Sequence, residues 1–252
     1  AALPVAEIER LPITHGTQRL ALAELFSVTD TPAATSAQDT CELRLQGDCT
    51  RIDRIGWQMA SGTLHVDGSV GDHAGGGLRD GVLHITGNAG ALAACEMAGG
   101  RLTVEGNVGD CAASALPGSM NGMSGGTLVV HGHAGDRFGD CMRRGTAVVH
   151  GHVGDFLASR MVAGTIAIGG TAGQHIGYGM RRGSVVFAQP LPPASLPDTF
   201  VPAGTEAAAF WQLLARDLAR HGGPFTALPA RAIERHLGDL AAGGKGELIC
   251  PC

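Results

Sequence analysis

The sequence predicts an all-β solenoid, a right-handed parallel β-helix of about seven coils with a small helical appendage at its C-terminus. Three observations carry this prediction: a glycine-anchored repeat of 19 residues, alternating apolar side chains within each repeat, and 40 glycines in 252 residues. Nineteen residues are too few for a four-stranded blade or a helical pair, but they fit one coil of a β-helix. Parallel strands connected in this way wind right-handed.

One glycine in each coil sets the register of the repeat. The intervals between these register glycines are 19, 19, 26, 19, 19 and 19 residues, so one coil carries seven extra residues. Two more glycines follow six and nine residues later in every complete repeat, and we expect the coil to turn there. The register glycines are Gly62, Gly81, Gly100, Gly126, Gly145, Gly164 and Gly183.

The second and fourth residues after each register glycine are apolar, as in Leu64 and Val66 or Leu128 and Val130. A period of two indicates a strand with these side chains facing the core. The third residue before each register glycine is methionine in every coil except that of Leu78, which we interpret as an apolar ladder in the core.

The repeats divide the chain into four expected parts. These are an N-terminal cap or extension (1–41), the parallel β-helix (42–188), a proline-rich linker (189–203) and a helical tail (204–252). We expect the first part to cover one open end of the solenoid.

The tail has the apolar spacing of helices. Ala207, Trp211, Leu214 and Leu218 share one helical face, and a second helix is expected around Ile233 and Leu237. We expect these helices to cap the solenoid or to bind a partner.

The composition indicates which partners the protein does not bind and in which compartment we expect it. A net charge of -5 argues against nucleic-acid or anionic-membrane binding, and no apolar run approaches the roughly 18 residues of a spanning helix. The seven cysteines show no paired C-x-x-C spacing and no signal segment is visible, so we expect a cytoplasmic protein with reduced thiols.

Acidic residues recur ten residues after the register glycine, at Asp72, Asp110, Asp136 and Asp155. Paired acids on a β-helix could cleave glycans, so a polysaccharide hydrolase is a remote alternative. We favour a structural role, in which each carboxylate binds backbone N–H groups of its own turn.

Two His-Gly-His motifs place His131 over His150 and His133 over His152 on neighbouring coils. Such pairs could hold a metal. We favour stacked, exposed imidazoles and expect no metal or bound cofactor on this chain.

Arginines form the most suggestive polar pattern. The first is Arg79. Arg143 and Arg144 belong to one MRRG motif, Arg181 and Arg182 belong to a second, and Arg160 lies in the coil between these two motifs. Guanidinium groups bind carboxylate or phosphate in bidentate fashion, so the arginines could bind an extended anion or an acidic partner surface. The alternative is that they pair with the aspartates or face solvent. We expect Arg144 and Arg182 about 10 Å apart, with Arg160 between them.

The repeat, the GMSGG segment at 122–126, the two MRRG motifs and the segment GDLAAGGKGEL from Gly238 resemble the C-type subunit of formylmethanofuran dehydrogenase. The repeat is also similar to the C-terminal domain of the large glutamate synthase subunit. A glutamate-synthase-type structural domain or a stand-alone β-helix binding module therefore remain alternative functions.

The resemblance implies a non-catalytic structural subunit of a complex that handles one-carbon units on a methanofuran-type carrier. Amidohydrolase-like and formyltransferase subunits would be its partners and would carry the active sites. The carrier's glutamate-containing tail makes the arginines candidate binding residues. Because Lys245 is the single lysine among 18 basic residues, codon usage favours the bacterial formyltransferase/hydrolase version over the dehydrogenase.

Overall fold

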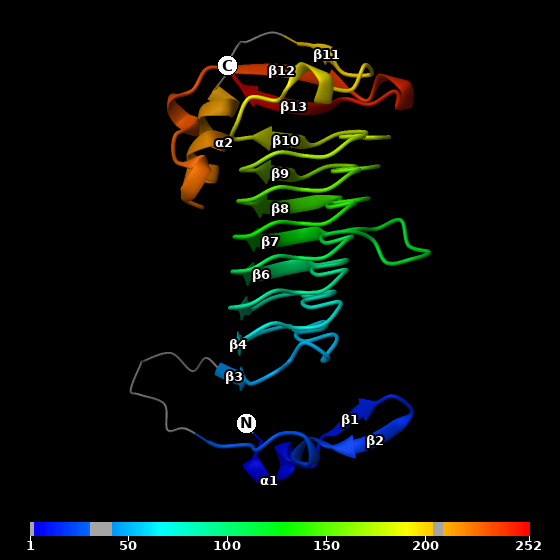
Figure 1. The fold of residues 1–252 in the computed structure, drawn as a ribbon, viewed down its shortest axis with the longest axis vertical. Coiled ribbons are helices and arrows are strands. Elements are labelled where there is room, and N and C mark those ends of the chain that lie inside the picture. The colour runs from blue at the N-terminus through cyan, green and yellow to red at the C-terminus, as the bar shows by residue number, and fades with distance from the viewer. Residues whose placement is uncertain (1–2, 31–41, 204–208) are drawn as a thin grey trace. The chain divides into compact units, whose positions relative to one another are not determined.

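The chain forms two compact units, Ala1–Cys41 and Glu42–Cys252 (Figure 1). The structure is a computed structural model that describes residues 3–30, 42–203 and 209–252. The first unit contains helix α1 (Val5–Ile8), the antiparallel hairpin of β1 (Pro12–His15) and β2 (Gln18–Ala21), and the 3-10 helix η1 (Leu22–Glu24). That this unit covers an end of the solenoid stays a prediction.

The second unit is a parallel β-solenoid of about eight turns, which confirms the predicted fold class. Each strand pairs in parallel with the strand of the next coil, and Leu64, Leu83 and Leu102 lie in register on adjacent strands. The strands are β3 (Glu42–Gln46), β4 (Thr63–Asp67), β5 (Val82–Ile85), β6 (Ala98–Val104), β7 (Ser124–Val130), β8 (Arg144–Val149), β9 (Thr165–Ile168) and β10 (Ser184–Phe187).

The predicted inward columns form the core. Val66, Ile85, Val104 and Val130 are completely buried, and so are the methionines from Met97 to Met180 in the predicted ladder. On a second side of the coil, the eighth residue after the register glycine forms isolated parallel bridges, such as Ala134 with Val153. The apolar periodicity therefore identified the core correctly.

The register glycines are required by the close approach of neighbouring coils. Gly126 has a φ of +79°, and a Cβ atom there would lie 2.6 Å from the carbonyl oxygen of Gly99 on the preceding coil. A side chain would meet both backbone strain and a main-chain clash. The 19-residue glycine period thus records one tight corner in every coil.

The C-terminal tail extends the sheet. β13 (Gly246–Pro251) pairs in parallel with β10, β12 (Ile233–Gly238) pairs antiparallel with β13, and β11 (Val201–Pro202) lies at the edge. The expected helix around Ile233 and Leu237 is therefore wrong. Its six residues pair in continuous register with β13, from Ile233 with Pro251 to Gly238 with Gly246, and this pairing outweighs the helical spacing. Short 3-10 helices connect the tail: η2 (Pro193–Ser195), η3 (Gly223–Phe225), η4 (Leu228–Ala230) and η5 (Leu240–Ala242).

Helix α2 (Ala209–Ala219) packs against the outer face of the last coils (Figure 1). Trp211 and Leu218, both on the predicted helical face, are buried in a second core with Val148 and Val186. Ala207, also assigned to that face, lies outside the described residues. The helix thus covers the side of the solenoid instead of forming an end cap.

A histidine cluster lies where this tail meets the solenoid. The ring of His150 packs edge-on against Phe225 of η3 at 5.3 Å between centroids and lies 4.5 Å from the ring of His131. Its Nε2 atom is buried and has no hydrogen-bond partner among the described residues. Burial and the neighbouring His131 and His221 lower the pKa of His150, and Glu105 acts in the opposite direction.

We predict that Val130→Asp prevents stable folding, because the inward-facing site would bury an unpaired charge. The loss should exceed about 4 kcal/mol of unfolding free energy. The matched control is Val82→Asp, since Val82 is 37% exposed on the outer face of β5. Urea denaturation monitored by circular dichroism compares the two variants. A Val130→Asp protein with a wild-type midpoint would contradict the core assignment.

We also predict that docking of the tail weakens below about pH 6.5. The pKa of His221 is lowered by burial and by Arg101, with Asp217 opposing. When the pKa of a histidine is lower in the folded state, the unfolded state binds more protons, so stability is full above the unfolded pKa and falls as pH decreases. The protection factors of the α2 amides, which are corrected for the slower intrinsic exchange at low pH, should fall on acidification. The fall should be smaller in His150→Gln and of wild-type size in the control His15→Gln. A fall of equal size in all three proteins would contradict the histidine assignment.

Candidate functional site

Four of the predicted arginines lie at the corner where the strands begin. The register Thr146–Thr165–Ser184 across β8, β9 and β10 places Arg144 and Arg182 in one column, with Ala163 between them. Arg143 and Arg181 precede them in the chain and form the adjacent column. All four side chains are exposed. We call Arg143, Arg144, Arg181 and Arg182 the arginine corner.

The other two predicted arginines lie outside the arginine corner. Arg160 does not lie between Arg144 and Arg182, because its backbone pairs with Tyr178 on the turn side of the coil. Its guanidinium instead binds the carboxylate of Asp140 through two hydrogen bonds. The Asp140 side chain is only 10% exposed, so we assign this ion pair a structural role. Arg79 is exposed but lies three coils from Arg143 in the same column.

Lys245 was not among the predicted site residues. Its backbone N–H donates to the carbonyl of Arg181 at 2.7 Å, so the turn before β13 stacks on the arginine corner. Its side chain is exposed and extends the positive column by one layer. The segment that contains Lys245 is part of the family resemblance, but its position becomes clear only from the pairing of β13 with β10. At the other end, Nη2 of Arg143 donates to the carbonyl of Met120 in the seven-residue insertion at 3.4 Å.

The recurring aspartates connect successive coils. Oδ1 of Asp136 accepts the backbone N–H of Asp155 at 2.8 Å, and Oδ1 of Asp155 accepts that of Gln174 at 2.7 Å. The acceptor role was predicted, but the donors belong to the next coil and not to the same turn. A carboxylate engaged in this way supports stacking of the coils, so the geometry favours a structural role over glycan cleavage.

Of the two histidine pairs, His133 and His152 are stacked and exposed as predicted, whereas the ring of His150 is tilted against His131 and half-buried against Phe225. The rings of His133 and His152 are nearly parallel, with centroids 5.0 Å apart. Their Nδ1 atoms accept backbone N–H groups of the following coil, from His152 and Thr171 respectively. No group of three or more His, Cys, Asp or Glu is placed to hold a metal in the part of the chain that the structure describes.

The cysteines in the described ranges are free thiols; Cys41 lies outside these ranges. Burial raises the pKa of Cys95 to about 12 and that of Cys250 to about 11. Since the thiolate is the nucleophile, these cysteines are poorly suited to covalent chemistry.

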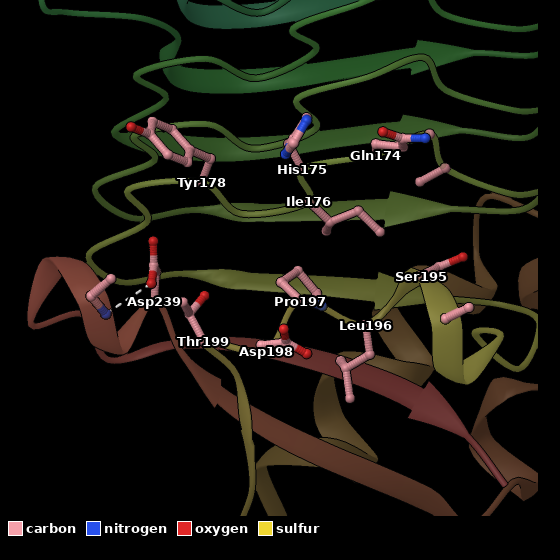
Figure 2. A pocket seen from close by; sticks show the side chains of 14 residues that line it. Gln174, His175, Ile176, Tyr178, Ser195, Leu196, Pro197, Asp198, Thr199 and Asp239 are labelled. Carbon is pink, nitrogen blue, oxygen red and sulfur yellow. Dashed lines mark hydrogen bonds between the residues drawn. The ribbon is translucent and has the colours of Figure 1, made fainter.

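A pocket of about 630 Å³ lies at the C-terminal end of the solenoid (Figure 2). One wall is the last turn of the repeats, with Gln174, His175 and Tyr178, and the opposite wall is the segment 194–199. Asp239 closes one side and is 4% exposed. We call this cavity the end pocket. No motif in the sequence pointed to it, because it depends on how the tail folds back.

The fold and these sites define a glycine-repeat β-solenoid protein with a charged corner and a laterally docked tail. No family model matches the chain. A chain in the crystal structure of the formyltransferase/hydrolase complex FhcABCD from Methylorubrum extorquens, in complex with methylofuran, is 38% identical. The TM-score is 0.87, and the match covers 99% of this chain and 90% of that one. The chain belongs to the family of the formylmethanofuran dehydrogenase C-type subunit.

Two curated relatives match over the repeats. The C-type subunit of molybdenum-containing formylmethanofuran dehydrogenase 1 from Methanosarcina barkeri is 36% identical over 67 residues, 27% of this chain and 22% of the relative. The C-type subunit of tungsten-containing formylmethanofuran dehydrogenase 2 from Methanothermobacter wolfeii is 33% identical over 77 residues, 31% and 28% of the two chains. The matched part thus spans about a quarter of these relatives. Within the described residues, no helix is long and apolar enough to cross a membrane.

We predict that Asp239→Ala destabilises the C-terminal end of the solenoid. Its carboxylate accepts the backbone N–H of Gly179 at 3.0 Å and that of Ala241 at 2.9 Å. Loss of these acceptors should lower the unfolding free energy by about 1–3 kcal/mol, and Asp239→Asn, which keeps one carbonyl oxygen, should lose less. Urea denaturation measures the effect against Asp198→Ala, a change at an exposed carboxylate of the same pocket. Equal midpoints for Asp239→Ala and the wild type would refute this role.

Proposed function

We propose that the chain is the non-catalytic C-type subunit of a cytoplasmic formyltransferase/hydrolase complex in one-carbon metabolism. Its partners are the amidohydrolase-like and formyltransferase subunits that carry the active sites. The observation that carries the proposal is the match over 99% of the chain to a component of the FhcABCD complex. A match of this extent supports the formyltransferase/hydrolase version over the dehydrogenase.

The described structure is consistent with a supporting role. The recurring carboxylates and imidazoles bind backbone groups of the next coil, and Cys95 and Cys250 have raised thiol pKa values. The chemistry of the complex is therefore assigned to the partner subunits. The solenoid supplies a rigid surface on which side chains recur about every 4.8 Å.

We further propose that the arginine corner guides the anionic tail of the carrier. The FhcABCD structure contains methylofuran, and a carboxylate-rich tail needs several cationic groups along one line. The corner offers four exposed guanidinium groups in two adjacent columns, with Lys245 one layer further. Arg160 is not part of this surface, since Asp140 already binds it. Because each exposed contact contributes only about 0.2–1 kcal/mol, affinity comes from several acting together and falls with salt.

The predicted outcome for the quadruple change of Arg143, Arg144, Arg181 and Arg182 to Ala is a folded chain with at least about tenfold weaker binding of oligoglutamate, equivalent to about 1.4 kcal/mol. The control replaces four exposed arginines elsewhere and so removes the same amount of charge. It should bind oligoglutamate with wild-type affinity, and it changes Arg19, Arg51, Arg216 and Arg220 to Ala. Isothermal titration at several salt concentrations measures both.

A second titration with the purified partner subunits separates the two kinds of ligand. Weaker binding of partners with unchanged oligoglutamate binding would reassign the arginine corner to an interface with those partners. Unchanged affinity for both would show that it is only a solvated surface. Formyl transfer or formate release by the isolated chain would contradict the non-catalytic role.

A further inference from the structure

The turn side of the solenoid is held together by backbone hydrogen bonds between coils at fixed positions. Counted from the register glycine, the N–H at position 8 donates to the carbonyl at position 7 of the next coil. The N–H at position 11 donates to the carbonyl at position 10 of the next coil. Val153 donates to Thr171 at 2.9 Å and Phe156 donates to Gln174 at 2.8 Å in this way. Each coil therefore presents two such donors to its successor.

The last coil presents the same donors without a successor. The corresponding residues are Ala172 and His175, and among the described residues neither backbone N–H has a hydrogen-bond acceptor. Both residues line the end pocket, and His175 is labelled in Figure 2. The two donors thus belong to a regular hydrogen-bond pattern that ends at this cavity.

A third donor of the same series shows how the chain replaces a missing coil. At position 15, the N–H of Arg160 donates to the carbonyl of Tyr178 at 2.7 Å. In the last coil, Gly179 occupies this position, and its N–H donates to the carboxylate of Asp239 at 3.0 Å. The tail therefore supplies one substitute acceptor and leaves the other two donors facing the pocket.

The remaining lining determines which ligand would fit. Asp198 and Asp239 place two carboxylates in the pocket, and no arginine or lysine is among the described residues that line it. The two carboxylates would repel a small anion there, although the N–H groups could donate hydrogen bonds to it. An extended polypeptide is neutral along its backbone and carries both carbonyl acceptors and N–H donors. The exposed ring of Tyr178 and the side chain of Leu196 offer apolar contacts to its side chains.

We propose that the end pocket is the docking site for an extended segment of a partner polypeptide, which takes the place of the missing coil. Carbonyl groups of the segment accept the N–H groups of Ala172 and His175, and a basic side chain pairs with Asp198. This is strand addition on the turn side of a solenoid. The partner is another member of the complex if the proposed function holds, but the docking mode depends only on the pocket.

Amide hydrogen exchange tests this proposal in the native complex and in the isolated chain. Segment 171–178 should exchange at least about tenfold more slowly in the complex. Segment 132–138 is the internal control, since its equivalent N–H groups at Ala134 and Arg137 are bonded to the next coil in both states. Equal exchange of segment 171–178 in the two states would overturn the proposal. Protection produced by oligoglutamate alone, without partner subunits, would assign the pocket to the carrier's tail and overturn a partner polypeptide as its occupant.

Two variants test the pocket by binding. Ser195→Trp fills the cavity and Asp198→Arg reverses its charge, and each should weaken binding of the purified partner subunits at least about tenfold. Glu234→Arg is the matched control, because Glu234 is exposed on β12 and does not line the pocket. Circular dichroism confirms that each variant is folded, and Asp198→Arg, at an exposed site, remains informative if Ser195→Trp does not fold. Wild-type affinity of the folded variants would overturn the proposal. The identity of the bound subunits tests the proposed function separately.

Discussion

The hydrogen bonds between successive coils are the interaction on which the rest of the structure depends. Each strand, each corner and each turn donates to the coil beside it, and side chains such as Asp136 and His133 repeat the same contact. These bonds need coils that approach within one strand spacing, which excludes a Cβ atom at corners such as Gly126. The core packing and the surface pattern both follow from this spacing, because side chains at the same position of successive coils lie next to one another.

The strict stacking lets different sides of the solenoid take different roles without disturbing one another. The outward column carries His65, His84 and Thr103 in β4 to β6 but Val148 and Val186 in β8 and β10, where α2 covers it. The corner before the strands displays cationic groups in the same coils. The apolar surface on which the tail docks and the arginine corner therefore lie in the same coils but in separate columns of side chains.

The sequence predicted the parts of the fold that repeat. The inward positions, including Val130 and the methionine ladder, were identified because every coil places apolar residues at the same positions. The tail was predicted less well: the four-residue spacing of Ile233 and Leu237 suits a helix, yet pairing with β13 makes this segment a strand. Such pairing depends on contacts distant in sequence, which local periodicity does not contain.

The candidate site shows the same limit. The shared column of Arg144 and Arg182 followed from the repeat, whereas Arg160 was misplaced because it lies on another side of the coil. Its partner Asp140 is twenty residues earlier, and only the folded coil brings the two together. Lys245 and the end pocket arise where the repeat stops, so no periodic signal could have located them.

The short edge strand β11 has a consequence for self-association. An open sheet edge can recruit a second molecule and start a filament, and stacked coils are especially suited to growth end to end. At this edge of the eleven-stranded sheet, strand β11 is only two residues long, and one of them, Pro202, has no N–H group to donate to a further strand. The β11 edge is thereby a poor template for a further strand, so a chain that joins this end of the solenoid would do so more readily beside the sheet.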